Sequence, residues 1–192
     1  MRIIAGHARG RRLVAPRGRA TRPTTDRVRE AIFSMVGTRM DLDGARVLDL
    51  FAGTGAMGCE ALSRGAATAA FIDDSREADK AIRENLRLVG GRGIVLSGKV
   101  QRLLPTLEGP DGFDLVFMDP PYGDHVIAET LRCLLGHRLL GAEAIVVAEH
   151  GRDEPLPEES ELATLTLLTS RRYGETLVTL WQTAEAPTEE VP

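Results

Sequence analysis

The 192-residue sequence has little cysteine and no long apolar run. Its two cysteines, Cys59 and Cys133, lack metal-ligand spacing, which excludes a zinc framework and a disulfide scaffold and favours a reducing compartment. No stretch approaches the length of a membrane span, and the first residues lack the apolar core of a signal peptide. Hydrophobic content of 43% and charged content of 27% are ordinary for a globular protein. We therefore expect a cytoplasmic protein of one domain, with or without an appendage.

Lysine is absent from the first 40 residues, and acidic residues are scarce there. This segment carries ten arginines against Asp26 and Glu30, a net charge of +8, and because the whole chain carries -4, the remainder carries -12. A basic segment on an acidic body indicates a polyanionic partner that touches one end of the molecule, although a solvated charged tail is the alternative. Arginine forks suit phosphate oxygens and base edges. The candidates for this contact are Arg9, Arg11, Arg12, Arg22 and Arg27.

An alternation of strand and helix patterns from residue 46 onward predicts an α/β fold. Apolar runs predict strands at 47–51, 67–72, 94–96, 115–118 and 144–149, and helical patterns lie at 56–64, 77–89, 100–107 and 126–135. Strands that are apolar on both faces and separated by helices indicate a parallel sheet covered on both sides. Residues 162–169 and 176–181 predict an antiparallel pair at its edge. We expect a Rossmann-like, mostly parallel sheet with an antiparallel edge strand and helices on both faces.

The two ends of the chain differ from this body. The first residues predict a small hairpin, with strands at 2–6 and 11–15, and a helix that begins at Thr24, Thr25 or Asp26 and runs to about residue 36. This helix is expected to pack on the body and leave the arginines exposed. We therefore interpret 1–40 as a basic N-terminal extension, 41–183 as the main domain and 184–192 as an acidic, disordered tail.

A glycine-rich loop follows the first strand of the body. Residues 53–58 match the dinucleotide fingerprint G-x-G-x-x-G, and Asp73 ends the next strand twenty positions after Gly53. Taken literally, this pattern predicts a nicotinamide or flavin enzyme, but Asp49 would lie near the pyrophosphate and repel it. Asp49 suits a cofactor that brings an amino group instead. S-adenosylmethionine does so, and Asp73 can accept hydrogen bonds from its ribose hydroxyls. A tight turn without a ligand is the plain alternative.

The tetrapeptide Asp119-Pro120-Pro121-Tyr122 follows the apolar run 113–118. Its prolines stiffen the backbone and remove two N–H donors, which leaves carbonyl acceptors between a carboxylate and an aromatic ring. Asp119 and the Pro120 carbonyl can accept from the amino group of a nucleobase while Tyr122 stacks on the ring. An ordinary strand exit into a proline turn is the alternative. Because the carboxyl ends of parallel strands meet at one edge, we expect Asp49, Asp73 and Asp119 to share one rim.

With both motifs present, the chain resembles a class I S-adenosylmethionine-dependent methyltransferase, whose motif I corresponds to 47–55 and motif IV to 119–122. It is more closely similar to the RsmD family, which methylates the exocyclic N2 of one guanine in 16S ribosomal RNA. That closer resemblance rests on residues 1–6, 9–13, 22–33 and 173–176. It covers nearly the whole chain except the tail. The family usually has glutamate after the second strand, where this chain has Asp73 and Asp74.

The resemblance implies a cofactor, a partner and a set of site residues. The cofactor would be S-adenosylmethionine, and the partner would be 16S ribosomal RNA within the small ribosomal subunit or its precursor, bound by a monomer without a metal. The implied cofactor-binding residues are Asp49, Phe51, Ala52, Gly53, Thr54, Gly55, Asp73, Asp74, Val100 and Asp119. The implied catalytic residues are Asp119, Pro120 and Tyr122. The alternatives are a DNA adenine N6-methyltransferase, a non-catalytic RNA-binding assembly factor with this fold and, more remotely, a dinucleotide oxidoreductase.

Overall fold

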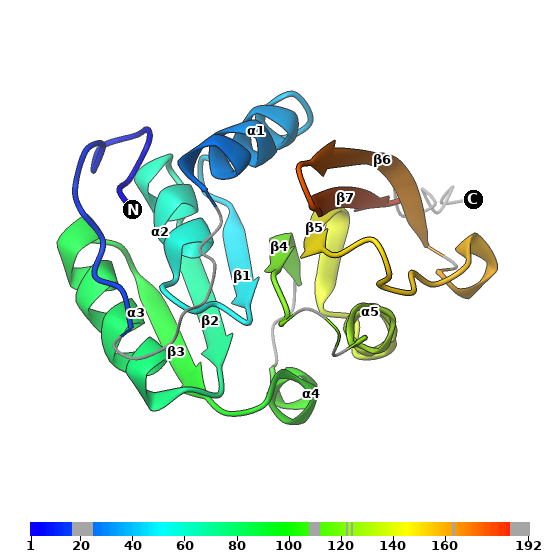
Figure 1. Ribbon diagram of the computed structural model, residues 1–192. Coiled ribbons are helices and arrows are strands. Elements are labelled where there is room, and N and C mark those ends of the chain that lie inside the picture. Colours follow the sequence, from blue (N-terminus) through cyan, green and yellow to red (C-terminus); the bar gives the residue numbers. More distant parts are fainter. Residues whose placement is uncertain (17–24, 108–111, 122, 124, 163, 185–192) are drawn as a thin grey trace, which may run out of the picture.

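The computed structural model describes residues 1–16, 25–107, 112–121, 123, 125–162 and 164–184. Within these residues lies a seven-stranded sheet in the order β3-β2-β1-β4-β5-β7-β6 (Figure 1). The strands are β1 (Arg46–Leu50), β2 (Thr68–Asp73), β3 (Gly93–Ser97), β4 (Phe113–Met118), β5 (Leu140–His150), β6 (Leu165–Tyr173) and β7 (Thr176–Thr183). The first five strands pair in parallel, and β7 pairs antiparallel with β5 and β6. The predicted sheet, with its antiparallel edge pair, is confirmed.

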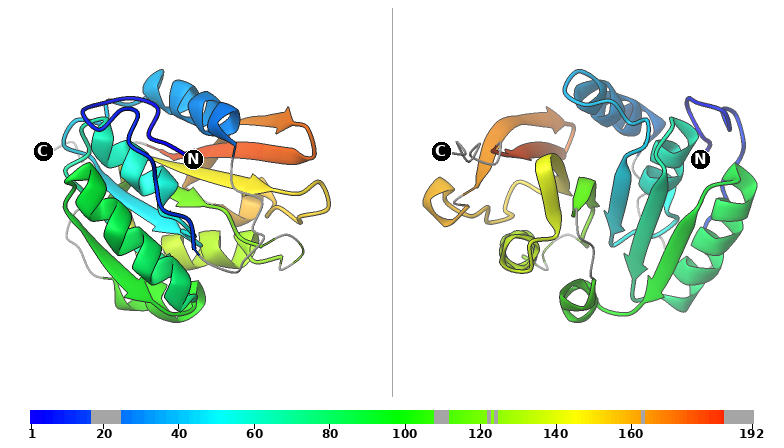
Figure 2. Two further views of the ribbon diagram at one scale, coloured as in Figure 1. Left: turned by 60° about the vertical axis from the view of Figure 1, so that its left-hand side comes forward. Right: turned by 180° about the vertical axis from the view of Figure 1, so that it is seen from behind.

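Helices cover both faces of this sheet (Figure 2). One face packs against α1 (Asp26–Gly37), α2 (Ala56–Ser63) and α3 (Arg76–Val89), and the other against α4 (Val100–Leu103) and α5 (Ile127–Gly136). Successive strand residues serve opposite faces, so that the fully buried Val47 and Leu48 belong to two different hydrophobic clusters. This explains why the central strands are apolar at nearly every position. None of the described helices is long and apolar enough to cross a membrane.

Helix α3 follows its predicted pattern closely. The Ser75 side chain accepts a hydrogen bond from the Ala78 amide, and Gly90 ends the helix in the left-handed conformation at φ 70°. The inward face is apolar except at one position. Its buried residues are Ala78, Ala81, Ile82, Asn85, Leu86 and Val89. Burying this face fixes which side of α3 faces outward.

Two predicted elements are shorter in the structure. The predicted helix at 100–107 is α4 followed by a 3-10 turn, η1 (Leu104–Thr106), because Pro105 has no N–H with which to continue an α-helix. The predicted strand at 47–51 ends at Leu50, because Phe51 adopts a positive φ of 56° and begins the glycine loop. A second 3-10 turn, η2 (Glu159–Glu161), precedes β6.

The predicted N-terminal hairpin is wrong in detail. Residues 1–16, here called the N-terminal segment, fold back on themselves, but only one antiparallel bridge forms, between Arg2 and Arg12. The backbone amides of Ile4 and Ala5 donate instead to the carboxylate of Glu60 in α2, at 2.7 and 2.9 Å. A buried carboxylate therefore binds two successive amides of the segment and docks it onto α2.

Helix α1 begins where the sequence predicts, with the Thr25 hydroxyl accepting from the Val28 amide. The expectation that its arginines are exposed is wrong for Arg29, which is fully buried. The Arg29 guanidinium pairs with Asp26 at 3.2 Å and lies 3.9 Å from Glu60. It also donates to the Arg2 carbonyl. Arg29 thus joins α1, α2 and the N-terminal segment, and its charge is used inside the protein.

Candidate cofactor and nucleic-acid site

The carboxyl ends of β1, β2 and β4 lie at one level of the sheet, here called the rim. Leu50 is the last residue of β1. It pairs with Ile72, one position before the end of β2, and with Met118, the last residue of β4. Beyond the strands, the Ala52 amide donates to the Ile72 carbonyl at 3.1 Å and the Asp119 amide to the Leu50 carbonyl at 3.4 Å. The glycine loop and the start of the Asp119–Pro121 turn are therefore direct neighbours, although 66 positions separate Gly53 from Asp119.

The glycines of the loop have two different surroundings. A Cβ on Gly53, which has a φ of 55°, would meet nothing closer than 4.0 Å, so open space lies above this residue. On Gly55 it would lie 3.1 Å from Ile82 and Phe71, and on Gly58 only 2.4 Å from the Phe71 ring. Gly55 and Gly58 thus allow α2 to pack closely on β2 and α3. Gly53 leaves room for a ligand to approach the backbone.

Asp49 lies beneath this loop and is only 3% exposed. One of its carboxylate oxygens accepts a hydrogen bond from the Gly58 amide at 2.9 Å. Burial raises the pKa of the Asp49 carboxyl to about 8; the Gly58 hydrogen bond opposes this rise, and the nearby Asp73 charge adds to it. A carboxyl in this state gains from an approaching cation, which fits the ammonium group of S-adenosylmethionine.

Asp73 holds together the two turns that form the rim. Its carboxylate accepts from the Gly53 amide at 2.8 Å and from the Ser75 amide at 2.9 Å. A carboxylate has about four lone-pair sites, so two remain for hydroxyl donors such as those of a ribose. Asp74 is exposed beside it. The Gly98 amide donates to the Asp73 carbonyl at 2.9 Å, which brings the loop before the buried Val100 to the same rim.

The structure describes only part of the tetrapeptide motif. Asp119 is half-buried, Pro120 is buried and Pro121 is exposed. Tyr122 lies outside the described residues, so its stacking role stays a prediction. The same holds for Arg22 and for the predicted tail beyond residue 184.

The other predicted arginines lie on the surface of the N-terminal segment and α1. Arg9, Arg11, Arg12 and Arg27 are all exposed. The Arg11 guanidinium donates to the Leu88 carbonyl of α3, which fixes the segment's fold-back loop beside the end of that helix. The predicted contacts with nucleic acid are therefore sterically open and remain predictions.

Asn85 couples the N-terminal segment to the glycine loop, and the sequence reasoning missed it. Its side-chain amide donates to the carbonyls of Thr54 and Val14, each at 2.9 Å, and its oxygen accepts from the Val14 amide at 2.8 Å. The signal was present in the sequence: Asn85 is the polar residue in the otherwise apolar face of α3. A buried polar side chain requires partners, and here they belong to the candidate site.

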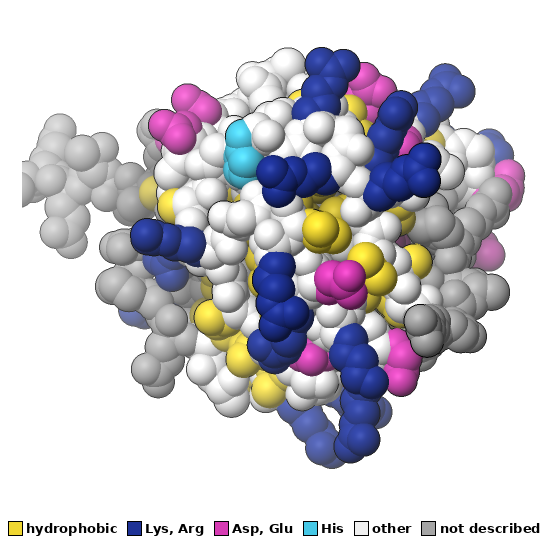
Figure 3. All heavy atoms as spheres, turned by 90° about the vertical axis from the view of Figure 1, so that its left-hand side faces the viewer, with side chains coloured by type: hydrophobic (Ala, Val, Ile, Leu, Met, Phe, Trp, Pro, Cys, Tyr) yellow, Lys and Arg dark blue, Asp and Glu magenta, His cyan; other side chains and the backbone are white. Residues whose placement is uncertain are grey.

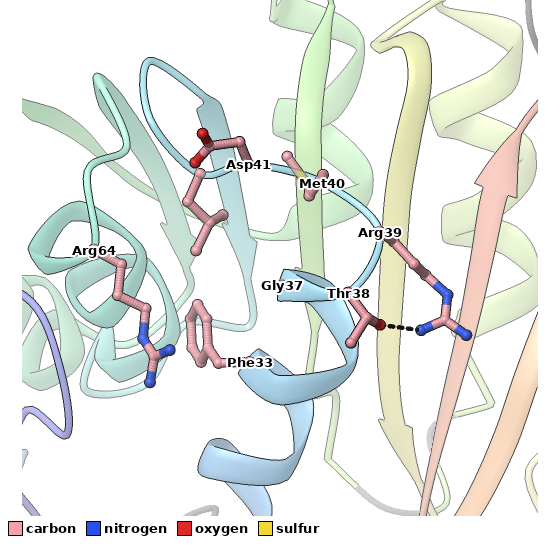
Figure 4. Close-up of a pocket in the computed structure, with 8 residues that line it drawn as sticks. Phe33, Gly37, Thr38, Arg39, Met40, Asp41 and Arg64 are labelled. Atoms are coloured by element: carbon pink, nitrogen blue, oxygen red, sulfur yellow. Dashed lines mark hydrogen bonds between the residues drawn. The ribbon is translucent and has the colours of Figure 1, made fainter.

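An open hollow of about 550 Å³ lies at the end of β1 opposite the rim. It is lined by Phe33, Gly37, Thr38, Arg39, Met40, Asp41, Leu42 and Arg64 (Figure 4). Both of its arginines have partners in the protein. Arg64 lies 4.5 Å above the Phe33 ring and pairs with Glu60 at 2.8 Å, and Arg39 donates to the Thr38 hydroxyl at 3.0 Å. The rim therefore remains the better candidate site.

Comparison with known proteins places the whole fold in one family. The family model described as Conserved hypothetical protein 95 matches residues 1–182. The chain belongs to this family, the RsmD family. YlbH of Bacillus subtilis (strain 168) is 36% identical over 185 residues, 95% of this chain and 98% of that protein. Ribosomal RNA small subunit methyltransferase D of Escherichia coli (strain K12) is 37% identical over 158 residues, 82% of this chain and 78% of that protein.

Solved structures agree with membership of the RsmD family. The structure of yhhF from Escherichia coli has a TM-score of 0.82 at 33% identity, and the match covers 97% of this chain and 99% of that one. More distant structures share the fold alone. Magnesium protoporphyrin IX methyltransferase from Synechocystis PCC 6803, solved with bound SAM, has a TM-score of 0.59 at 13% identity and covers 82% of this chain and 79% of that one. The chain therefore shares its fold with these methyltransferase structures.

Proposed function

We propose that this RsmD-family protein transfers a methyl group from S-adenosylmethionine to the exocyclic N2 of a guanine in 16S ribosomal RNA, within an assembled or partly assembled small subunit. The observation that carries this proposal is the contact between the ends of β1 and β4, with the Asp119 amide 3.4 Å from the Leu50 carbonyl. It brings acceptors for an amino group beside a loop with room for the methyl donor. The named E. coli relative supports ribosomal RNA as the substrate class.

The residues of the rim would divide the work of binding the cofactor. The charged form of Asp49 attracts the ammonium group, and the remaining lone pairs of Asp73 accept from ribose hydroxyls. The open backbone at Gly53 allows close approach. Backbone groups near Val100 would meet the adenine ring. S-adenosylmethionine supplies an electrophilic methyl group on its sulfonium.

Asp119 and the Pro120 carbonyl would orient the amine. The N2 lone pair of guanine is delocalised into the ring, so the amine must be held close to the methyl carbon in a geometry that disfavours this delocalisation. Two acceptors that bind the N–H groups achieve both, and such positioning contributes roughly 7–11 kcal/mol in favourable cases. Transfer would exchange the S–C bond of the sulfonium for a new N–C bond, with S-adenosylhomocysteine as the leaving product and the surplus N2 proton released to solvent. Aspartate is a weak base, so we assign Asp119 to positioning first.

The decisive experiment follows label from S-adenosylmethionine into free 16S ribosomal RNA, small subunits and DNA, with nucleoside analysis of each product. We expect labelled N2-methylguanosine, with transfer to subunits exceeding transfer to free RNA. Labelled N6-methyladenine would instead identify the DNA adenine enzyme, and cofactor binding without transfer to any substrate would identify a non-catalytic assembly factor.

A variant pair tests the role of Asp119 in the same assay. Asp119→Ala should lower the transfer rate by at least about a hundredfold while cofactor binding stays close to wild type, because the amine loses an acceptor. Asp43→Ala, an exposed acid before the opposite end of β1, is the matched control and should leave transfer unchanged. Full activity of Asp119→Ala would remove Asp119 from the mechanism.

A further inference from the structure

The outward surface of α3 carries a row of basic side chains. Arg76, Lys80, Arg83 and Arg87 recur at intervals of four, three and four residues, which places them along one stripe of the helix. All four are exposed, and the stripe lies opposite the buried face of α3. A helix of 14 residues is about 21 Å long, so the row extends over most of that length. We call these four residues the α3 ridge.

α3 carries three acidic side chains beside the four cations of the ridge, but among the described residues Arg83 is the one ridge cation with an ion pair. Arg83 pairs with Asp79 at 3.0 Å, and this hydrogen-bonded partner raises the pKa of Arg83 further. Glu77 and Glu84 are exposed at the flank of the row. Among the described residues, no acidic side chain forms an ion pair with the other three ridge cations. Like charges three and four positions apart repel on a helix, so this row gains from an external anion.

One end of the ridge reaches the rim. Arg76, its first residue, is three positions after Asp73, whose carboxylate binds the amides of Gly53 and Ser75. The Ser75 side chain in turn caps α3. The cation at this end is therefore tied by short covalent and hydrogen-bonded links to the loop where the cofactor is proposed to bind.

The other end of the ridge reaches the N-terminal segment. Arg11 donates to the carbonyl of Leu88, the residue after Arg87, and Arg9 and Arg12 are exposed in the same fold-back loop. Lys and Arg side chains are spread over this face of the molecule, with fewer acidic ones between them (Figure 3). The ridge thus joins the proposed site of methyl transfer to the arginines of the N-terminal segment in one basic surface.

We propose that the α3 ridge binds the phosphate backbone of the substrate RNA and guides it from the N-terminal segment to the rim. This proposal rests on the proposed function for the identity of the polyanion. Regular cations along a rigid helix suit the repeating phosphates of a nucleic acid strand, and such contacts hold register and position without reading bases. The ridge therefore contributes affinity and placement, and the rim contributes the chemistry.

Two double variants with equal loss of charge test the ridge. Lys80→Gln with Arg87→Gln removes two cations that have no ion pair among the described residues. The control, Arg132→Gln with Arg138→Gln, removes two exposed cations from α5 and the turn after it, on the other side of the sheet. Filter binding of a 16S ribosomal RNA transcript is measured between 50 and 200 mM salt, together with S-adenosylmethionine binding and thermal melting of each variant.

The ridge variant should bind the RNA more weakly and with less dependence on salt. Loss of two phosphate contacts lowers the slope of log affinity against log salt by about 1.4 to 1.8, which weakens binding about a hundredfold at the lower salt concentration and about tenfold at the higher one. Cofactor binding and melting should stay at wild-type values. The control variant should keep the wild-type slope.

Equal slopes in the ridge variant and in wild type would overturn the proposal. So would an equal loss in both double variants, which would indicate a general effect of net charge. Because binding is measured without methyl transfer, this result is separate from the fate of the proposed function. If RNA affinity depends on the ridge but the protein methylates no RNA, the proposed role of the ridge stands and only the proposed methyl transfer is overturned.

Discussion

Binding of S-adenosylmethionine should release a proton from Asp49. With a pKa of about 8 for this carboxyl, roughly nine tenths of the free protein carries neutral Asp49 at pH 7. An ammonium group beside it favours the charged form, so about 0.9 proton should leave per cofactor bound at pH 7 and about 0.5 at pH 8. Affinity should rise by up to about tenfold per pH unit below pH 8 and level off above it.

Calorimetry in two buffers of different ionisation heat measures this release directly. Asp49→Asn retains an oxygen that can accept from the Gly58 amide but cannot become charged, so it should bind the cofactor more weakly and release no proton. Asp114→Asn is the matched control, because Asp114 also accepts a backbone amide, that of Arg46 at 2.7 Å, at the opposite end of the sheet. If Asp49→Asn binds as tightly as wild type, Asp49 serves only to anchor α2.

The same carboxyl predicts how stability depends on pH. Its pKa is higher in the folded protein than the usual 3.8 of an aspartate, so the folded state binds more protons than the unfolded state between these values. The contribution of Asp49 to the free energy of unfolding therefore falls as pH rises from about 4 to about 8. Urea denaturation of wild type and Asp49→Asn across this range measures the difference. An equal pH dependence of the two proteins would contradict the assignment.

Three further substitutions test how the site is supported. Gly58→Ala places a Cβ 2.4 Å from the Phe71 ring. The free energy of unfolding, measured in urea, should fall by about 1–3 kcal/mol. An unchanged midpoint of unfolding would mean that the Phe71 ring moves aside without cost. Asn85→Ala leaves the backbone groups that it binds without partners, which should cost about 2–4 kcal/mol and weaken cofactor binding, and unaltered binding would separate Asn85 from the site. Gly6→Ala brings a Cβ within 1.7 Å of the Ser63 carbonyl, so hydrogen exchange should rise in residues 1–16 but not in the sheet, and protection retained there would refute that docking geometry.

Elements whose pattern is local could be predicted from the sequence. The strands of the sheet and α3 can be recognised from the spacing of their apolar residues and from the residues that cap them. The start of α1 can be recognised from Thr25, which caps it. The glycine loop could be placed between strand and helix because its spacing is itself local. The adjacency of the loop and Asp119 followed from a general property of parallel sheets, and the Leu50 contact bears out that arrangement.

Features decided by distant partners could not be predicted. The predicted strands at 2–6 and 11–15 reduce to one bridge, and the local sequence does not show that Glu60, 55 and 56 positions away, binds the amides of Ala5 and Ile4. Arg29 was expected to be exposed because the local sequence shows its neighbour Asp26 but not Glu60 and the Arg2 carbonyl, which also contact it in the fold. The regular spacing of the α3 ridge can be seen in the sequence. Its proposed role could not be inferred there, because the sequence does not show that the rim and the N-terminal segment lie at its two ends.

The docking of the N-terminal segment also sets an order of events during synthesis. The segment is made before its partners: the Asn85 side chain binds Val14, and the Val89 carbonyl lies 2.8 Å from the His7 ring nitrogen. At 5–20 residues per second, the interval between residues 16 and 89 is roughly 4–15 s. The segment therefore docks completely only after α2 and α3 have been made.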